Sequence, residues 1–189
     1  MNQIRISDVT MKQTGKEFSL SFKEKLEIPK LLDKLNVDVI ELEGIVQPKI
    51  DALRIKSVAS TVKHSIVAVP VALSEESVEA TWNALKEAKR PRLQVFASVS
   101  PVQMEYLFHK KPDAMLKAIE ETIAACAKKT ADVEFIADDA TRSDTAFLYK
   151  VLKAAISAGA KTITVCDATG SVLPYDIGEF VDNLYNNVE

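Results

Sequence analysis

The length, composition and charge of the chain restrict what it can be. It has 189 residues, of which 47% are hydrophobic and 27% are charged, and its formal net charge is −3. This composition is typical of a soluble α/β domain in which amphipathic helices cover a buried sheet. No basic stripe predicts nucleic acid or an anionic membrane surface as a partner. Because no apolar run approaches the ~18 residues of a membrane span, and the polar start is no signal peptide, we expect a cytoplasmic protein.

The first half of the chain shows alternating strand and helix patterns. Apolar and polar residues alternate over residues 4–10, which predicts a strand. A helix follows from Ser21 and Glu24, which have the spacing of a capping box. The same patterns, with Ser74 as a helix cap, predict a strand at 37–43, a helix at 49–62, a strand at 66–71 and a helix at 75–88.

The second half continues the alternation. It predicts a strand at 93–98, a helical region at 102–129 broken near Pro112, and a strand at 133–137. A helix at 145–158 and a strand at 162–166 follow. The last predicted helix has Pro174 near its first turn and ends about Asn186 and Asn187. Gly159 ends the helix at 145–158, because glycine adopts the left-handed cap conformation easily. The strand starts are spaced as βαβ units around a parallel sheet. We therefore expect one domain over residues 1–189.

The number of units predicts an incomplete barrel. A closed (β/α)₈ barrel needs eight strand–helix units and typically about 250 residues, whereas this pattern contains six. The expected fold class is α/β, an incomplete (β/α)₈ TIM-type barrel of six parallel βα units that lacks strands seven and eight. Exposed edges of such a sheet favour association, so the expected partner is a second copy of the chain or a complementing barrel chain.

Carboxylates dominate the ends of the predicted strands. In parallel α/β folds the chemistry lies at the carboxyl ends of the strands, and the acidic residues there are Asp8, Glu41, Glu43, Asp138, Asp139 and Asp167. A ring of oxygen ligands would suit a hard cation such as Mg²⁺ or Mn²⁺. The alternative is that strand-end aspartates only cap the following helices. Asp138 and Asp139 could have this role alone.

Four segments at these strand ends share a pattern with a known family. They are residues 6–13 (ISDVTMKQ) with 35–41 (LNVDVIE), 100–106 (SPVQMEY), 138–144 (DDATRSD), and 165–170 (VCDATG) closed by Pro174. In order and spacing they resemble the isopropylmalate synthase, homocitrate synthase and hydroxymethylglutaryl-CoA lyase superfamily, whose members are pyruvate carboxyltransferase-type TIM barrels. The resemblance covers nearly the whole chain.

The resemblance implies acyltransferase chemistry, a Claisen-type condensation of acetyl-CoA with a 2-oxo acid. A divalent metal would chelate the 2-oxo acid and an arginine would stabilise the enolate charge. The catalytic positions fall on Lys12, Glu41 and Arg142, and the substrate-binding positions fall on Asp8, Thr10, Gln13, Gln103, Asp139, Asp167 and Thr169. The alternative is that the retained carboxylates and arginine form a buried network that only supports the loops.

The sequence departs from the family pattern at the reacting groups. Gln13 stands where the family has its metal-binding aspartate, and a neutral amide is a weaker ligand for a hard cation. Lys12 replaces the catalytic arginine and lacks its planar fork of donors. Gln103 replaces a histidine, and Ala168 replaces the threonine beside Asp167.

The family's remaining metal ligands are a His-x-His pair on the seventh strand, which the sequence does not contain. His64 and His109 are predicted to be ordinary surface or packing residues, because neither follows a strand end with the required spacing. We therefore expect no metal site, and no cofactor for the isolated chain.

Three functional hypotheses remain. The first is an isopropylmalate/homocitrate synthase-like catalytic-domain relative that is inactive alone, a pseudoenzyme that could serve as a binding or regulatory protein for a 2-oxo acid or an acetyl-CoA-like molecule. The second is a subunit of a split acyltransferase, completed by a partner that carries His-x-His. The third is an enzyme with new chemistry, although the sequence contains no nucleophile–base pair and no phosphate-binding glycine loop.

Overall fold

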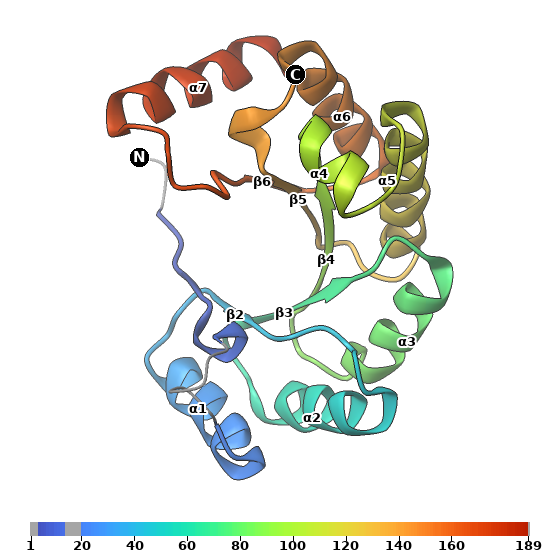
Figure 1. Cartoon of the computed structure of the whole chain (residues 1–189). Coiled ribbons are helices and arrows are strands. Elements are labelled where there is room, and N and C mark those ends of the chain that lie inside the picture. The colour runs from blue at the N-terminus through green and yellow to red at the C-terminus, as the bar shows by residue number, and fades with distance from the viewer. Residues whose placement is uncertain (1–3, 14–19, 189) are drawn as a thin grey trace. The chain divides into compact units, whose positions relative to one another are not determined.

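The computed structural model describes residues 4–13 and 20–188. Within these ranges, six strands form one sheet in the order β1-β2-β3-β4-β5-β6, and helices alternate with the strands along the chain (Figure 1). The chain divides into two compact units, one up to Gln94 and one from Val95. The strand β4 (Pro91–Ser98) contributes to both. The predicted fold class, six parallel βα units of an incomplete (β/α)₈ barrel, is confirmed, whereas one domain over residues 1–189 stays a prediction.

Unit 1 contains three strands before β4. Its elements are β1 (Ser7–Asp8), the 3-10 helix η1 (Thr10–Lys12), α1 (Phe22–Lys34), β2 (Val39–Glu41), α2 (Pro48–Thr61), β3 (Ile66–Val71) and α3 (Glu75–Leu85). The strands β1, β2 and β3 pair in parallel, as predicted. The first strand is shorter than the predicted residues 4–10, because the Asp8 carboxylate accepts a hydrogen bond from the Thr10 N–H at 2.9 Å and the chain turns into η1.

The core of unit 1 lies between the sheet and its helices. The helix α2 packs against both α1 and α3, and the fully buried side chains include Ile40, Ile55, Val58, Val69, Val78 and Leu85. The predicted capping box starts α1: the Ser21 hydroxyl accepts from the Glu24 N–H, and the Glu24 carboxylate accepts from the Ser21 N–H. Such a reciprocal pair satisfies two backbone donors that a helix start leaves open.

Unit 2 contains the rest of β4 and two further strands. Its elements are α4 (Pro101–Tyr106), α5 (Pro112–Ala127), β5 (Val133–Asp138), the 3-10 helix η2 (Ala140–Arg142), α6 (Thr145–Ala158), β6 (Thr162–Val165) and α7 (Pro174–Asn187). The helical region predicted at 102–129 is two helices, because Pro112 disfavours helical backbone at the residue before it. The helix α6 has the predicted bounds, and Gly159 ends it with a positive φ of 120°.

The packing of unit 2 differs between its core and its last elements. The helices α5 and α6 pack against each other (Figure 1) and bury Met115, Ile119, Ile123, Leu148 and Val151. By contrast, no residue of α7 with a described side chain is buried, and every residue of β6 is only half-buried. None of the helices in the described part of the chain is long and apolar enough to cross a membrane.

Candidate functional site

In unit 1, the strand ends bring together a lysine cluster made of Ser7, Lys12, Glu41 and Gln94. The Lys12 Nζ lies 2.5 Å from the Glu41 Oε2 and 3.4 Å from the Gln94 Oε1. The Gln94 Nε2 donates to the same Glu41 oxygen at 3.1 Å, and the Ser7 hydroxyl donates to the Glu41 Oε1 at 2.6 Å. Two predicted catalytic residues, Lys12 and Glu41, are therefore in direct contact.

The surroundings of Glu41 favour its ionised form. Burial alone raises the pKa of this carboxyl, but hydrogen bonds from Lys12, Ser7 and Gln94 outweigh burial and hold the pKa below its ordinary value of 4.5. The Lys12 side chain is 29% exposed. The cluster thus presents an ammonium that a carboxylate holds in place and that a small anion can still reach.

In unit 2, the turn after β5 forms an arginine cluster made of Ser100, Asp139 and Arg142. The Arg142 Nε and one terminal nitrogen donate to the two Asp139 oxygens at 2.8 and 2.6 Å, which is a bidentate pair. The Ser100 hydroxyl donates to the Asp139 Oδ2 at 2.5 Å. Hydrogen bonds from Arg142 and Ser100 outweigh burial and lower the pKa of Asp139. The Asp139 side chain is fully buried, whereas Arg142 is 43% exposed.

The loop after β6 is organised by Asp167. Its carboxylate accepts hydrogen bonds from the Val172 N–H at 2.9 Å, the Thr141 hydroxyl at 3.0 Å and the Thr169 hydroxyl at 3.3 Å. The hydrogen bond from the Val172 N–H is the main reason that the pKa of Asp167 is lowered. The predicted residues Asp167 and Thr169 therefore lie together, in contacts that hold the loop.

The neighbouring residue Asp138 has the opposite electrostatics. Burial and the negative charge of Asp139 raise the pKa of Asp138, although a hydrogen bond from the Gln103 side chain partly opposes them. The Gln103 Oε1 is buried and has no hydrogen-bond partner among the described residues. Two adjacent aspartates at the end of β5 thus differ in which protonation state the protein favours.

The residues predicted around a metal do not assemble into a ligand set. Asp8 binds the backbone at Thr10, whose own side chain is half-buried, and the exposed Gln13 side chain makes no hydrogen bond among the described residues. His64 and His109 are both exposed, in agreement with the prediction that they are ordinary residues. Within residues 4–13 and 20–188, no group of three His, Cys, Asp or Glu side chains could hold a metal ion. These donors do not fit the divalent cation that the resemblance implies.

Sequence reasoning missed two members of the lysine cluster, Ser7 and Gln94. Gln94 is fully buried, and it lies between Leu93 and Val95 in the apolar run of β4. A polar residue inside a buried strand must find a partner, so its position contained a signal. Its partner could not be named, because Glu41 is 53 residues away in the sequence.

The sequence of this chain is similar to a known protein family. A family model described as HMGL-like matches residues 3–189, which is nearly the whole chain. The chain belongs to the HMGL-like family. The predicted resemblance is therefore confirmed at the level of the family.

Individual members of the HMGL-like family match the whole of this chain but only part of their own length. The chain is 34% identical over 188 residues to a 2-isopropylmalate synthase from Aquifex aeolicus (strain VF5), covering 98% of this chain and 36% of that protein. A 2-isopropylmalate synthase from Carboxydothermus hydrogenoformans is 35% identical over 190 residues, which is 37% of its length. The chain thus spans about a third of the length of these curated relatives.

A solved structure supports the fold of the HMGL-like family for this chain. The crystal structure of hydroxymethylglutaryl-CoA lyase from Pseudomonas aeruginosa superposes with a TM-score of 0.76 at 15% sequence identity. The match covers 96% of this chain and 62% of the lyase chain. At this identity the similarity concerns the fold alone.

Proposed function

We propose that this chain is a relative of the isopropylmalate synthase catalytic domain that performs no condensation of acetyl-CoA with a 2-oxo acid by itself. The lysine cluster is the observation that carries the proposal. Its single ammonium is held by Glu41 where the family pattern has an arginine. An arginine fork could give two parallel N–H groups to a developing oxyanion, whereas an ammonium is a point charge without that geometry.

The absence of a fitting metal site in the described residues supports the same proposal. Condensation of this type needs a Lewis acid on the electrophile, and the exposed amide of Gln13 and the backbone-bound Asp8 make a poor ligand pair for a hard cation. The two clusters each present one partly exposed cation, which is Lys12 in unit 1 and Arg142 in unit 2. Either cation can hold the carboxylate of a 2-oxo acid, or an acetyl-CoA-like anion, without converting it.

The test is an assay of CoA release from acetyl-CoA with several 2-oxo acids, in the presence of Mg²⁺, Mn²⁺ or Zn²⁺. The wild type should release no more CoA than a control without protein, while the Aquifex relative run beside it should be active. The double variant Lys12→Arg with Gln13→Asp should also be inactive, because one ligand and one fork do not make a metal site. Turnover by the wild type or by the double variant alone would contradict the proposal. A one-to-one metal site in either of these two proteins, measured by calorimetry, would also contradict it.

A second candidate function is favoured by the last elements of unit 2. The strand β6 is an edge of the sheet, its residues are half-buried, and α7 buries no described side chain. Such an edge could accept a further strand from a partner, which would make this chain a subunit of a split acyltransferase. A stoichiometric partner carrying His-x-His, recovered by native purification from the source cells, would favour this candidate over an isolated binding or regulatory protein.

A further inference from the structure

The outer face of α1 is an apolar stripe that its own chain leaves exposed. Ile28, Leu31 and Leu35 have the i, i+3, i+7 spacing of residues along one side of a helix. Leu31 is 61% exposed and Leu35 is 73% exposed. The buried residues of α1 are Pro29 and Asp33, and each is two positions from Leu31, which is about 200° around the helix. The α1 stripe, made of Ile28, Leu31 and Leu35, therefore points away from the core of unit 1.

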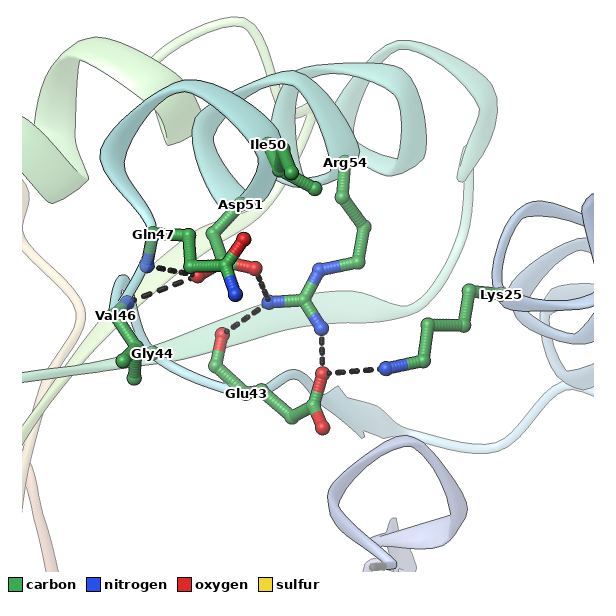
Figure 2. Close-up of a pocket in the computed structure, with 8 residues that line it drawn as sticks. All are labelled: Lys25, Glu43, Gly44, Val46, Gln47, Ile50, Asp51 and Arg54. Atoms are coloured by element: carbon green, nitrogen blue, oxygen red, sulfur yellow. Dashed lines mark hydrogen bonds and ion pairs between the residues drawn. The ribbon is translucent and has the colours of Figure 1, made fainter. Parts of the chain in front are cut away.

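Two lysines beside the α1 stripe have no counter-ion. Lys25 is paired with the Glu43 carboxylate at 3.0 Å (Figure 2), and Lys30 is paired with a glutamate of its own helix at 2.8 Å. Lys23 and Lys34 are exposed and make no ion pair within residues 4–13 and 20–188. Because they are three helical turns apart, they lie on the same side of α1. One edge of the α1 stripe thus carries positive charge that is not paired.

The acidic side chains of α1 are engaged within the chain. Glu24 accepts hydrogen bonds in the capping box, and Glu27 is paired with Lys30. The Asp33 carboxylate is buried and accepts from the backbone N–H groups of residues 63, 64 and 65. The unpaired lysines beside the α1 stripe therefore match an acidic partner.

The outer face of α7 is also exposed, and its charge is negative. Tyr175, Gly178, Asp182 and Tyr185 follow one side of this helix at i, i+3, i+7 and i+10. Both tyrosines are 81% exposed. The helix contains three acidic residues and no lysine or arginine. The α7 stripe, made of these four residues, is thus aromatic and acidic.

Gly178 in the α7 stripe has no evident role within its own chain. A glycine inside a helix is destabilising relative to alanine. The φ angle of Gly178 is not positive, and a Cβ atom added there would meet nothing within 4 Å among the described residues. Neither the backbone conformation nor the packing of unit 2 therefore requires glycine. Glycine also permits the close approach of another backbone, which a helix lying across α7 would provide.

Charge decides which partner fits the two stripes. Two α7 stripes would bring acidic residues together, and two α1 stripes would bring the unpaired lysines together, and such like-charge contacts are unfavourable. The α1 stripe against the α7 stripe combines an apolar surface with tyrosines, which are enriched at protein interfaces, and places opposite charges at its edge. Each stripe is therefore complementary to the other and not to itself.

We infer that the α7 stripe of one copy of this chain docks against the α1 stripe of a second copy. Leu31 of one copy packs over Gly178 of the other, and Lys34 pairs with Asp182. The contact is heterologous, because the two copies contribute different faces. The inference goes beyond the proposed function and does not depend on it, because neither stripe contains a residue of the lysine cluster, the arginine cluster or the β6 edge.

The experiment measures self-association of the whole chain by analytical ultracentrifugation over increasing protein concentration. The wild type should associate with a Kd on the order of 10 µM or tighter. Leu31→Asp should weaken association by about tenfold or more, because it places a charge in the apolar stripe. Leu53→Asp is the matched control: Leu53 is 58% exposed on α2 and lies outside both stripes, so association should be unchanged.

A substitution at Gly178 separates docking from folding. Gly178→Gln adds a side chain where this chain has open space, so the urea midpoint should be unchanged or higher. The same side chain blocks the approach of α1 from a second copy, so association should weaken by about tenfold or more.

Mixing two variants tests that the contact is heterologous. Leu31→Asp keeps a sound α7 stripe, and Gly178→Gln keeps a sound α1 stripe. A mixture of the two should therefore associate more tightly than either variant alone. In the same way, Lys34→Glu and Asp182→Lys should each weaken association, and the chain that carries both changes should associate more tightly than either single variant.

Three results would overturn the inference. These are a wild type that remains monomeric at concentrations well above the expected Kd, equal effects of Leu31→Asp and Leu53→Asp, and a mixture of Leu31→Asp with Gly178→Gln that associates no more tightly than the separate variants. Each of them is independent of the CoA-release assay, so a failure of this inference is distinguishable from a failure of the proposed function.

Discussion

In the lysine cluster of unit 1 and in the arginine cluster of unit 2, a carboxylate at a strand end holds a cation. The two pairs differ in geometry and in burial. In unit 2 the two groups are three residues apart, the aspartate is fully buried, and two parallel N–H bonds join them. In unit 1 the ammonium comes from a residue 29 positions away, and the glutamate remains 13% exposed.

The two pairs also differ in whether the local backbone conformation depends on them. Asp139 has a positive φ of 55°, a conformation that aspartate tolerates better than most residues, and its side chain fixes the turn that Arg142 belongs to. Lys12 fixes no such turn, since its backbone is held by η1 and its ammonium contacts Glu41 and Gln94, which lie on other elements. The bidentate pair of Asp139 and Arg142 therefore holds a turn, whereas the pair of Lys12 and Glu41 joins two separate elements.

The largest expected effect is that of Asp139→Ala. This change removes three hydrogen bonds from a fully buried carboxylate, leaves the buried Ser100 hydroxyl without its acceptor, and puts alanine at a positive φ. We expect a loss of about 3 kcal/mol in the free energy of unfolding, measured by urea denaturation. Asp139→Asn is the control, because asparagine tolerates this backbone and can still accept a hydrogen bond, so its loss should be smaller. Equal losses would mean that neither the backbone conformation at position 139 nor a remaining hydrogen-bond acceptor there contributes to stability.

A smaller effect is expected for Lys12→Met in unit 1. Glu41 keeps its hydrogen bonds from Ser7 and Gln94, and water can reach part of the site, so the loss should be about 1 kcal/mol at neutral pH. The lowered pKa of Glu41 stabilises the fold above its ordinary value of 4.5, and this contribution is lost as the pH falls through the folded pKa. The difference between Lys12→Met and the wild type should therefore shrink in acid. A difference that is constant with pH would show that the ion pair is not its source.

The sequence predicted the elements best where local chemistry determines them. The bounds of β3 and α6 agree to the residue, because β3 is a buried apolar run and α6 lies between an aspartate cap and Gly159. The strand β1 was predicted too long, because the Asp8 side chain turns the backbone and a side-chain hydrogen bond leaves no trace in hydrophobic periodicity. The break between α4 and α5 was predicted only as a position near Pro112, not as a connecting segment.

The candidate site was predictable only in part. The family pattern pointed to Lys12, Glu41, Asp139 and Arg142, and the structure brings them together as two pairs. The family pattern could not give the partners Ser7, Gln94 and Ser100, because these contacts join residues that are far apart in the sequence and depend on how the chain folds. Gln13 was predicted to bind substrate, and its exposed side chain leaves that role a prediction.

The smallest expected effect is that of Asp138→Asn. Its stability relative to the wild type should change with pH in the opposite direction from that of Asp139→Asn. The pKa of Asp138 is raised by burial and by the charge of Asp139, so the stability linked to Asp138 is present below its ordinary value of 3.8 and is lost as the pH rises through the folded pKa. Asp138→Asn cannot ionise, so it should gain on the wild type as the pH rises. The gain should stay below about 0.5 kcal/mol, because Asp138 is only half-buried and water screens its charge.

Asp139→Asn should show the reverse pH dependence. The pKa of Asp139 is lowered, so the stability that this carboxylate contributes is present above its ordinary value of 3.8 and is lost as the pH falls through the folded pKa. The deficit of the variant should therefore grow as the pH rises, while Asp138→Asn gains. Urea midpoints measured for both variants between about pH 3 and pH 7 give the two slopes. Slopes of the same sign would contradict the opposite pKa shifts of Asp138 and Asp139 and would mean that the two adjacent carboxylates share one environment.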